Sequence, residues 1–265
     1  MKANAPIGIM DSGMGGLSVV LALQKDLPNE DIIYFGDTAN LPYGNKTVEQ
    51  IVDLSNNMIS FLEKKGVKCV GIACNTISAQ AAQLRPSHDI TIITVSECGA
   101  DAFGRMGIND IGLIATVATV DSGIYEKRIC AVNPNAKVIG EGSVHLARLV
   151  EENHPTTDAV DTEIKECMER LLAKGDVSHV ILGCTHYPLV ADRFKAACPD
   201  IEFVDPAPHQ VACIKEFLAE NDALNQSRKP KLTVYTSGDT AGFKDMCSKT
   251  GLCDHYDAEF IHVDN

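Results

Sequence analysis

The nine residues Val180–Pro188, VILGCTHYP, indicate the fold more clearly than any other segment of the chain. An apolar run ends at Gly183, Cys184 follows it directly, and a tyrosine–proline pair closes the segment. This order predicts a buried strand, a tight turn and the start of a new element. A cysteine just past the carboxyl end of such a strand lies where α/β sheets bind their ligands. If a helix follows, its free N–H groups favour a thiolate over a thiol at Cys184.

A second segment, Cys69–Thr76 with the sequence CVGIACNT, has the same arrangement. It places Cys74 after an apolar run and before Asn75 and Thr76, two residues whose side chains cap helices. Our hypothesis from these two segments is that Cys74 and Cys184 face one another across a single small substrate.

The composition is that of an ordinary globular protein. The 265 residues are 45% hydrophobic and 22% charged, and the net charge is −13, so nucleic acid is not an expected partner. No apolar run approaches the roughly 18 residues of a transmembrane helix. The N-terminus lacks the apolar segment of a secretory signal, so we expect a cytoplasmic protein without a membrane partner. Most of the ten cysteines are expected to be small buried side chains.

Strand-like and helix-like segments alternate along the chain, which predicts parallel sheets covered by helices. A capping-box pattern at Thr47 and Gln50 marks the start of the most clearly delimited helix. The predicted strands are 6–10, 31–35, 69–74, 90–95, 110–116, 136–140, 180–184, 201–205 and 232–236. The predicted helices are 17–27, 47–66, 78–84, 122–132, 157–174, 189–198, 210–218 and one after the last strand.

Two features of the sequence occur twice at similar offsets. The tripeptide at Ile7–Ile9 is similar to that at Ile111–Leu113, 104 residues later, and Cys74 precedes Cys184 by 110 residues. The fold class predicted is therefore α/β, with two similar α/β domains and mostly parallel sheets, each offering one cysteine from an equivalent strand end.

Two facing thiols suit one reaction in particular, the inversion of an amino acid at Cα. One group removes the α-proton from one face and the other returns a proton to the opposite face, and thiols have pKa values that proteins can tune. The negative charge that develops needs hydrogen-bond donors, for which Asn75, Thr76 and Thr185 are candidates. Asp11 is a candidate for binding the ammonium group of the substrate or for adjusting the acidity of the Cys74 thiol. His186 is a candidate for adjusting the acidity of the Cys184 thiol. No cofactor is required.

Five motifs resemble one family over nearly the whole chain. They are Asp11-Ser12-Gly13 with Gly15-Gly16, FGDTANLPYG at 35–44, ACNT at 73–76, GCTHYPL at 183–189 and YTSGD at 235–239. With these motifs the chain resembles the glutamate racemases, cofactor-independent enzymes of the aspartate/glutamate racemase superfamily. The resemblance implies two domains with the active site in the cleft between them. The first domain would comprise residues 1–97 and 208–265, and the second residues 98–207. It also implies that D-glutamate is made for peptidoglycan, and that the family's frequent homodimers are to be expected.

The resemblance also assigns roles to residues. It implies that Cys74 takes the proton from the D-isomer and Cys184 from the L-isomer. The full catalytic set is Cys74, Cys184, Asp11, His186 and Glu151, the substrate-binding set is Asp11, Ser12, Tyr43, Gly44, Asn75, Thr76, Thr185 and His186, and no metal is expected.

One segment departs from the family pattern. Glu141–Glu152 stands where the family has a proline-rich apolar stretch before a valine and a glutamate. This leaves open whether Glu151 or Glu152 is the supporting carboxylate, and whether aspartate or another amino acid is preferred to glutamate.

Other functions were weighed from the residues alone. Gly13-x-Gly15 after a strand, with Asp37 further on, is typical of dinucleotide-binding oxidoreductases, but Ser18 stands at the third glycine position. A non-catalytic small-acid binding protein of the periplasmic type would need a signal peptide. A zinc hydrolase built on Cys184 and His186 lacks recognisable further ligands.

Overall fold

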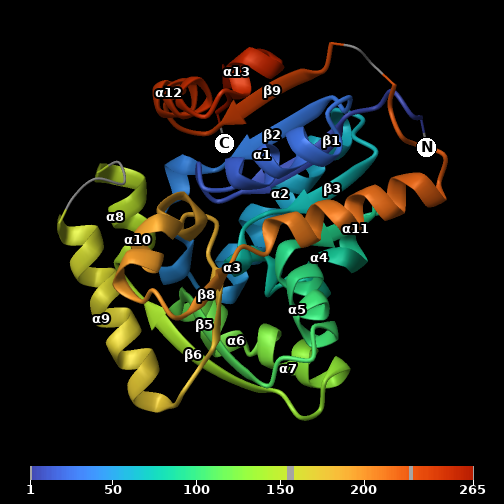
Figure 1. The fold of residues 1–265 in the computed structure, drawn as a ribbon. Coiled ribbons are helices and arrows are strands. Elements are labelled where there is room, and N and C mark those ends of the chain that lie inside the picture. The colour runs from blue at the N-terminus through green and yellow to red at the C-terminus, as the bar shows by residue number, and fades with distance from the viewer. Residues whose placement is uncertain (1, 154–157, 227–228, 265) are drawn as a thin grey trace.

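The chain folds into two parallel sheets covered by helices (Figure 1). The computed structural model describes residues 2–153, 158–226 and 229–264, and of Glu152 and Asn153 the backbone alone. The larger sheet has the order β10-β9-β2-β1-β3-β4 and the smaller one β6-β5-β7-β8, and every strand pairing in both is parallel. The strands are β1 (Ile7–Asp11), β2 (Ile32–Gly36), β3 (Cys69–Ile72), β4 (Ile92–Thr94), β5 (Asp110–Thr116), β6 (Lys137–Ser143), β7 (His179–Gly183), β8 (Glu202–Val204), β9 (Lys231–Thr236) and β10 (Asp257–His262). The predicted α/β class is confirmed.

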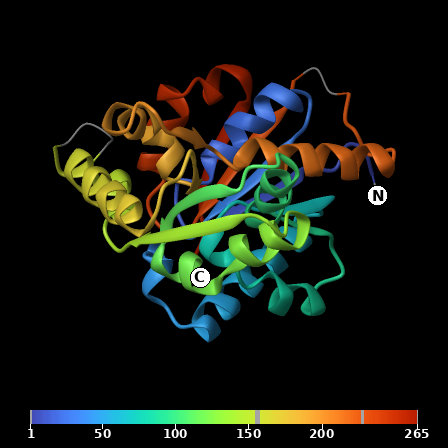
Figure 2. The same ribbon diagram turned by 60° about the horizontal axis from the view of Figure 1, so that its bottom comes forward.

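The two sheets repeat one topology. The inner order β2-β1-β3-β4 of the first sheet corresponds to β6-β5-β7-β8 of the second, which Figure 2 brings forward. Ile9 pairs with Gly71, and Cys74 follows three residues later; Leu113 pairs with Ile181, and Cys184 again follows three residues later. The two cysteines therefore occupy equivalent positions, and the predicted similarity of the two α/β halves is confirmed. The exact boundaries, 1–97 with 208–265 and 98–207, stay a prediction.

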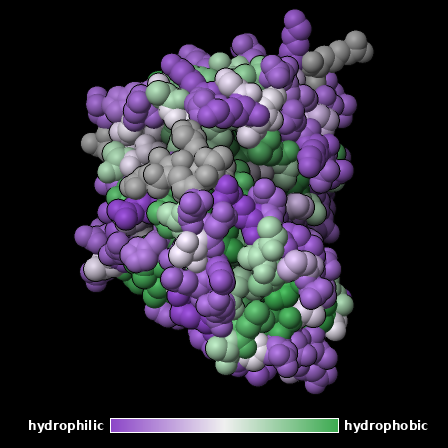
Figure 3. Space-filling view, turned by 60° about the vertical axis from the view of Figure 1, so that its left-hand side comes forward, coloured by the Kyte–Doolittle hydropathy of each residue, from purple (hydrophilic) through white to green (hydrophobic). Residues whose placement is uncertain are grey.

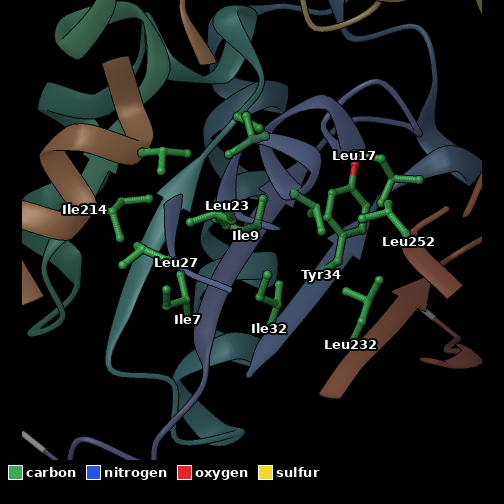
Figure 4. Packing of buried hydrophobic residues seen from close by; sticks show 14 of the residues in the cluster. Ile7, Ile9, Leu17, Leu23, Leu27, Ile32, Tyr34, Ile214, Leu232 and Leu252 are labelled. Carbon is green, nitrogen blue, oxygen red and sulfur yellow. The ribbon is translucent and has the colours of Figure 1, made fainter. Parts of the chain in front are cut away.

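The first sheet is buried on both faces. On one face α1 (Leu17–Asp26) and α11 (Ala207–Glu220) cover Ile7, Ile9 and Tyr34 (Figure 4). On the other face α2 (Val48–Lys64) covers the alternate strand positions, including Met10. Each fully buried aliphatic side chain contributes about 1.5–3 kcal/mol. Thr47 and Gln50 form the predicted capping box at the start of α2, which sets the beginning of this helix.

The second sheet is also covered on both faces. One cluster contains residues of α5 (Val95–Arg105), α7 (Ile124–Val132) and the sheet, among them Phe103, Leu113 and Tyr125. The other cluster contains residues of α8 (Leu146–Asn153), α9 (Asp158–Lys174) and α10 (Ala191–Ala197). The predicted first residue of α9, Thr157, lies outside the described residues.

Several elements differ from the prediction. The helix predicted at 122–132 is α7, which begins after Gly123 with its φ of +64°, and the helix before it, α6 (Val117–Ser122), was not predicted. The segment predicted as one helix at 78–84 contains the last residue of α3 (Asn75–Ser78) and all of α4 (Ala81–Leu84). After β7 the chain forms the 3₁₀ helix η4 (Tyr187–Val190) before α10. The short 3₁₀ helices are η1 (Thr38–Asn40), η2 (Tyr43–Asn45) and η3 (Arg85–Ser87).

The C-terminal segment was predicted to end in a helix, and this prediction is wrong. Two helices, α12 (Ala241–Lys249) and α13 (Leu252–His255), are followed by the edge strand β10. The strand has no apolar run, because its outer edge is free and several of its residues are exposed. Helices α5 and α8 were not predicted either.

The surface is largely polar. The face that includes α8 and α9 is mostly hydrophilic, with separate hydrophobic areas (Figure 3). No helix among the described residues combines the length and the apolar composition that crossing a membrane requires.

Candidate active site

The candidate residues come together where the carboxyl ends of strands from both sheets meet. Asp11 is the last residue of β1, Cys74 follows β3, and Cys184 follows β7. Contacts connect the two halves here: the hydroxyl of Thr185 donates to Asp11 Oδ1 at 3.3 Å, and the backbone N–H of Met14 donates to Glu151 Oε1 at 3.2 Å. This is the edge at which parallel α/β sheets bind ligands.

Cys74 is buried beside polar groups of its own half. Its Sγ lies 3.5 Å from the hydroxyl of Ser12. Burial, and then the charge of Asp11, raise the pKa of the Cys74 thiol to about 12, although Ser12 and the backbone N–H of Ile77 act in the opposite direction. The four-residue helix α3 therefore does not outweigh burial, and the pKa shifts away from neutrality. In this arrangement Cys74 holds its proton.

Cys184 has a different neighbour, the imidazole of His186. Its Sγ lies 3.6 Å from Nδ1 of His186, and Nε2 of His186 forms an ion pair with Glu151. Burial lowers the pKa of His186, but Glu151 and Cys184 together raise it well above the ordinary value. Burial raises the pKa of Glu151, but the charge and the hydrogen bond of His186, with the backbone N–H of Met14, together outweigh it and lower the pKa. These shifts place a positively charged imidazolium beside Cys184.

Glu151 reaches His186 from α8, the helix within the segment that departs from the family pattern. Leu146 and Val150 of the same helix are buried in the core of the second half, which fixes the side of α8 that faces the site. Of the two glutamates left open by the sequence, Glu151 is the one in contact with His186. The side chain of Glu152 lies outside the described residues.

Asp11 lies at the centre of the contacts between the two halves and is fully buried. Its Oδ2 accepts the backbone N–H of Gly13 at 3.0 Å, and its Oδ1 accepts the hydroxyl of Thr185. Burial raises the pKa of Asp11, although His186 and the N–H of Gly13 lower it. A buried carboxylate of this kind favours a cationic partner such as an ammonium group.

The glycines after β1 allow the loop to pass close to side chains of the other half. A Cβ added at Gly13 would lie 2.9 Å from Glu151 Oε1, and one at Gly15 would lie 2.6 Å from Thr185 Oγ1. In a dinucleotide-binding loop, the glycines make room for a pyrophosphate instead. Here the space is filled by side chains of this protein, which argues against the dinucleotide alternative.

The hydroxyl and amide donors form a second set of contacts between the halves. Thr76 Oγ1 lies 3.0 Å from Thr116 Oγ1, which lies 2.9 Å from Thr119 Oγ1. The hydroxyl of Tyr125 donates to Asn75 Oδ1 at 2.7 Å. Thr116, Thr119 and Tyr125 were not singled out from the sequence. The internal repeat contained a signal for one of them, because Thr116 stands 104 residues after Ser12.

Tyr43 and Gly44 lie in the loop after β2. The hydroxyl of Tyr43 donates to Asp37 Oδ2 at 2.5 Å, and Ser237, at the end of β9, donates to Asp37 Oδ1 at 2.5 Å. A Cβ at Gly44 would lie 3.7 Å from Thr116, so the backbone of this loop approaches the second half. Every substrate-binding candidate from the sequence thus lies at the junction or in a loop that contacts it.

The described residues contain no group of three or more histidine, cysteine, aspartate or glutamate side chains placed to hold a metal ion. Cys184 and His186 approach each other without further ligands of these types.

Comparisons with known proteins agree with this geometry. Residues 7–214 match the model of the Asp/Glu/Hydantoin racemase family. The chain belongs to this family. A curated relative is glutamate racemase 2 of Caldanaerobacter subterraneus subsp. tengcongensis, which is 38% identical over 90% of both chains.

Solved structures of this family are similar over almost their whole length. A glutamate racemase isoform from Bacillus anthracis matches with a TM-score of 0.90 and 31% identity, covering 99% of this chain and 98% of that one. The glutamate racemase of Francisella tularensis subsp. tularensis SCHU S4, solved in complex with D-glutamate, matches with a TM-score of 0.88 and 32% identity over 98% of both chains.

Proposed function

We propose that this chain is a glutamate racemase in which Cys74 and Cys184 are the two acid–base groups. The observation that carries the proposal is that the two thiols follow equivalent strands of two similar sheets, which meet at their carboxyl edges. The names of the relatives support glutamate as the substrate. The reaction is an isomerisation, and the substrate is a small molecule.

The chemistry balances with the groups present. Starting from L-glutamate, the thiolate of Cys184 takes the α-proton, and the electron pair of the broken C–H bond spreads into the carboxylate. The thiol of Cys74 then gives its proton to the opposite face of Cα, which forms the D-isomer. Starting from D-glutamate, the two thiols exchange roles. The raised pKa of Cys74 supports its role as the protonated partner in the first direction.

The surrounding residues are assigned supporting roles. Asn75, Thr76 and Thr185 donate hydrogen bonds to the substrate, where negative charge develops during the reaction. Asp11 binds the ammonium group, and His186 with Glu151 favours the thiolate of Cys184. Ser12 lowers the pKa of the Cys74 thiol through its hydroxyl, and Tyr43 and Gly44 contribute to substrate binding from the loop after β2.

Three further parts of the proposal follow from the resemblance to the family. The chain supplies acid and base itself, so the reaction proceeds without a cofactor. Its product serves peptidoglycan synthesis, and the protein acts in the cytoplasm as a homodimer. Light scattering after size-exclusion chromatography tests the dimer.

The test of the function is racemisation of L- and D-glutamate by the purified protein, with no cofactor added and with chelator present, followed by circular dichroism. Activity in both directions is the expected result. Loss of activity on exhaustive chelation would contradict the cofactor-independent mechanism. Aspartate is assayed in parallel, and a clear preference for aspartate would overturn the substrate assignment while leaving the two-thiol mechanism in place.

A further inference from the structure

The side chain of Asn75 has one end bound and the other end unpaired. Its Oδ1 accepts the hydroxyl of Tyr125 at 2.7 Å, whereas its Nδ2 has no hydrogen-bond partner among the described residues. The side chain is buried, with 3% exposed. A buried donor without a partner lowers the free energy of unfolding by about 1–3 kcal/mol, so native proteins seldom keep one without a functional reason. Asn75 directly follows Cys74, which places its amide next to the proposed reaction centre.

Tyr125 comes from the other half of the molecule. It is the second residue of α7, immediately after the turn at Gly123, and it is fully buried. Its ring belongs to the core cluster that includes Phe103 and Ala115. Because this packing fixes the ring, the position of the hydroxyl is fixed as well. Through this contact, the packed core of the second half fixes the position of the Asn75 side chain in the first half.

The tyrosine also determines which end of the amide it holds. Burial raises the pKa of Tyr125, so the phenol keeps its proton and acts as a donor. If the amide of Asn75 were reversed, the phenol O–H would face another donor and lose its acceptor in a buried site. The contact thus favours one orientation, with Oδ1 towards Tyr125 and Nδ2 directed away from it.

We propose that Tyr125 is a positioning residue, which holds the amide of Asn75 so that Nδ2 donates to the reacting carboxylate of the substrate. This inference rests on the proposed function. The carbon that Cys74 protonates carries this carboxylate, and its oxygens gain negative charge as the α-proton leaves. A donor already oriented towards these oxygens stabilises the transition state without reorganisation during the reaction. The substrate then satisfies the donor that is otherwise unpaired.

The first test is Tyr125→Phe, which removes the hydroxyl and keeps the ring. We expect kcat/KM for glutamate to fall about tenfold or more, with a decrease in kcat that exceeds any rise in KM. The matched control is Tyr256→Phe, because Tyr256 is also buried and its hydroxyl has no partner among the described residues. The control should keep wild-type kinetics. Melting temperatures of both variants show whether stability changes.

A double-mutant cycle separates positioning from general support of the fold. In an Asn75→Ala background, Tyr125→Phe should change kcat/KM less than about twofold, because the group through which it acts is gone. If the two effects on kcat/KM multiply independently, Tyr125 acts by another route and the proposal is wrong.

A further variant tests the donor end without altering Tyr125. Asn75→Asp keeps an oxygen for the phenol hydroxyl but replaces the donor by an acceptor, so activity should fall at least as far as in Asn75→Ala. Wild-type activity in Asn75→Asp, or wild-type kinetics in Tyr125→Phe, would overturn the inference. Absence of glutamate racemisation by the wild-type protein would instead contradict the proposed function.

Discussion

At the scale of single residues, the two thiols differ in what lies beside them. Burial and the charge of Asp11 raise the pKa of Cys74 to about 12, although the nearby hydroxyl of Ser12 lowers it. Cys184 lies beside an imidazole whose pKa is itself raised. The difference supports the proposed roles, in which Cys74 donates the proton and Cys184 is the base in the reaction of L-glutamate.

Removing the supporting groups tests this assignment. His186→Asn should lower kcat by at least about tenfold with a smaller change in KM, because His186 acts mainly in the transition state. Asp11→Asn should lower kcat/KM by at least about tenfold and also raise KM, because Asp11 binds the ammonium group of the substrate. His179→Asn is the matched control, since His179 lies at the opposite end of β7 and pairs with the exposed Glu202. Steady-state kinetics in both directions give the answer, and wild-type values for both site variants would contradict the roles proposed here.

The sequence allowed the prediction of residues that sit in local motifs. Cys74, Cys184 and His186 follow apolar strands within a few positions, so strand and turn patterns are enough to find them. Tyr125 belongs to the site only through its contact with Asn75 of the other half, which no local pattern contains. The choice between Glu151 and Glu152 stayed open because the two are adjacent in sequence. The packing of α8 is what turns Glu151 towards His186.

At the scale of elements, the loop between β1 and α1 depends on its glycines. In Gly15→Ala, the new Cβ would lie 2.6 Å from Thr185 Oγ1 and 2.8 Å from Nδ1 of His186. Overpacking of this kind costs about 1–3 kcal/mol. A displacement of about 1 Å at reacting groups can lower the rate on the order of 10²-fold, so kcat/KM should fall by about that factor. A variant with wild-type kcat/KM would show that the close approach has no role in activity.

The ion pair between Glu151 and His186 joins α8 to the start of η4 and should make stability depend on pH. The lowered pKa of Glu151 contributes stability above its ordinary pKa of 4.5, and this is lost as the pH falls through the lowered value. The raised pKa of His186 contributes fully below its ordinary pKa of 6.5, and this is lost as the pH rises through the raised value. Both contributions are complete between pH 4.5 and 6.5.

The melting temperature of the wild type minus that of Glu151→Gln should therefore be largest between pH 4.5 and 6.5 and smaller on either side. Thermal unfolding at several pH values measures this difference. The other ionisable groups are the same in both proteins, so the comparison reports mainly the pair. A difference that does not change with pH would show that the pair does not contribute in this way.

Elements with a strong apolar pattern were predicted well, and those without one were not. The capping box of α2 and the apolar strands of both sheets are local features, and the structure has them where expected. Strand β10 has no fully buried residue and carries Asp257, Glu259 and His262 on exposed positions, so its sequence lacks the apolar run that marks the other strands. Helix α6 has six residues, too few to show a helical pattern in the sequence, and Gly123 separates it from α7 in a left-handed conformation.

At the scale of the whole molecule, one buried ion pair connects distant parts of the first half. Lys68 forms an ion pair with Glu30, and its Nζ also donates to the carbonyl oxygens of Ala3 and Ala223, at 2.9 Å each. Both charged side chains are almost fully buried. The contacts bring together residues from both ends of the chain.

Lys68→Met should lower the free energy of unfolding by about 3–5 kcal/mol, because it leaves the carboxylate of Glu30 buried without its partner. Lys249→Met is the control, since the pair of Lys249 with Asp245 is exposed and should be worth less than about 1 kcal/mol. Urea denaturation measures both. An equal decrease in the free energy of unfolding in the two variants would show that burial of the Lys68–Glu30 pair does not increase its contribution to stability.

The central claim is that each half supplies one thiol, on opposite faces of one substrate, and isotope transfer tests it most directly. L-glutamate is incubated with the enzyme in D₂O, and both isomers are analysed at early times by mass spectrometry. The account predicts deuterium at Cα of the D-product, because Cys74 delivers solvent hydrogen, and mostly protium in the recovered L-glutamate, because Cys184 takes the original proton. Cys74→Ala and Cys184→Ala should each lower racemisation by at least about 10²–10⁴-fold. A single base would instead leave original protium in the D-product and add deuterium to the recovered L-glutamate. That result would contradict the two-thiol mechanism.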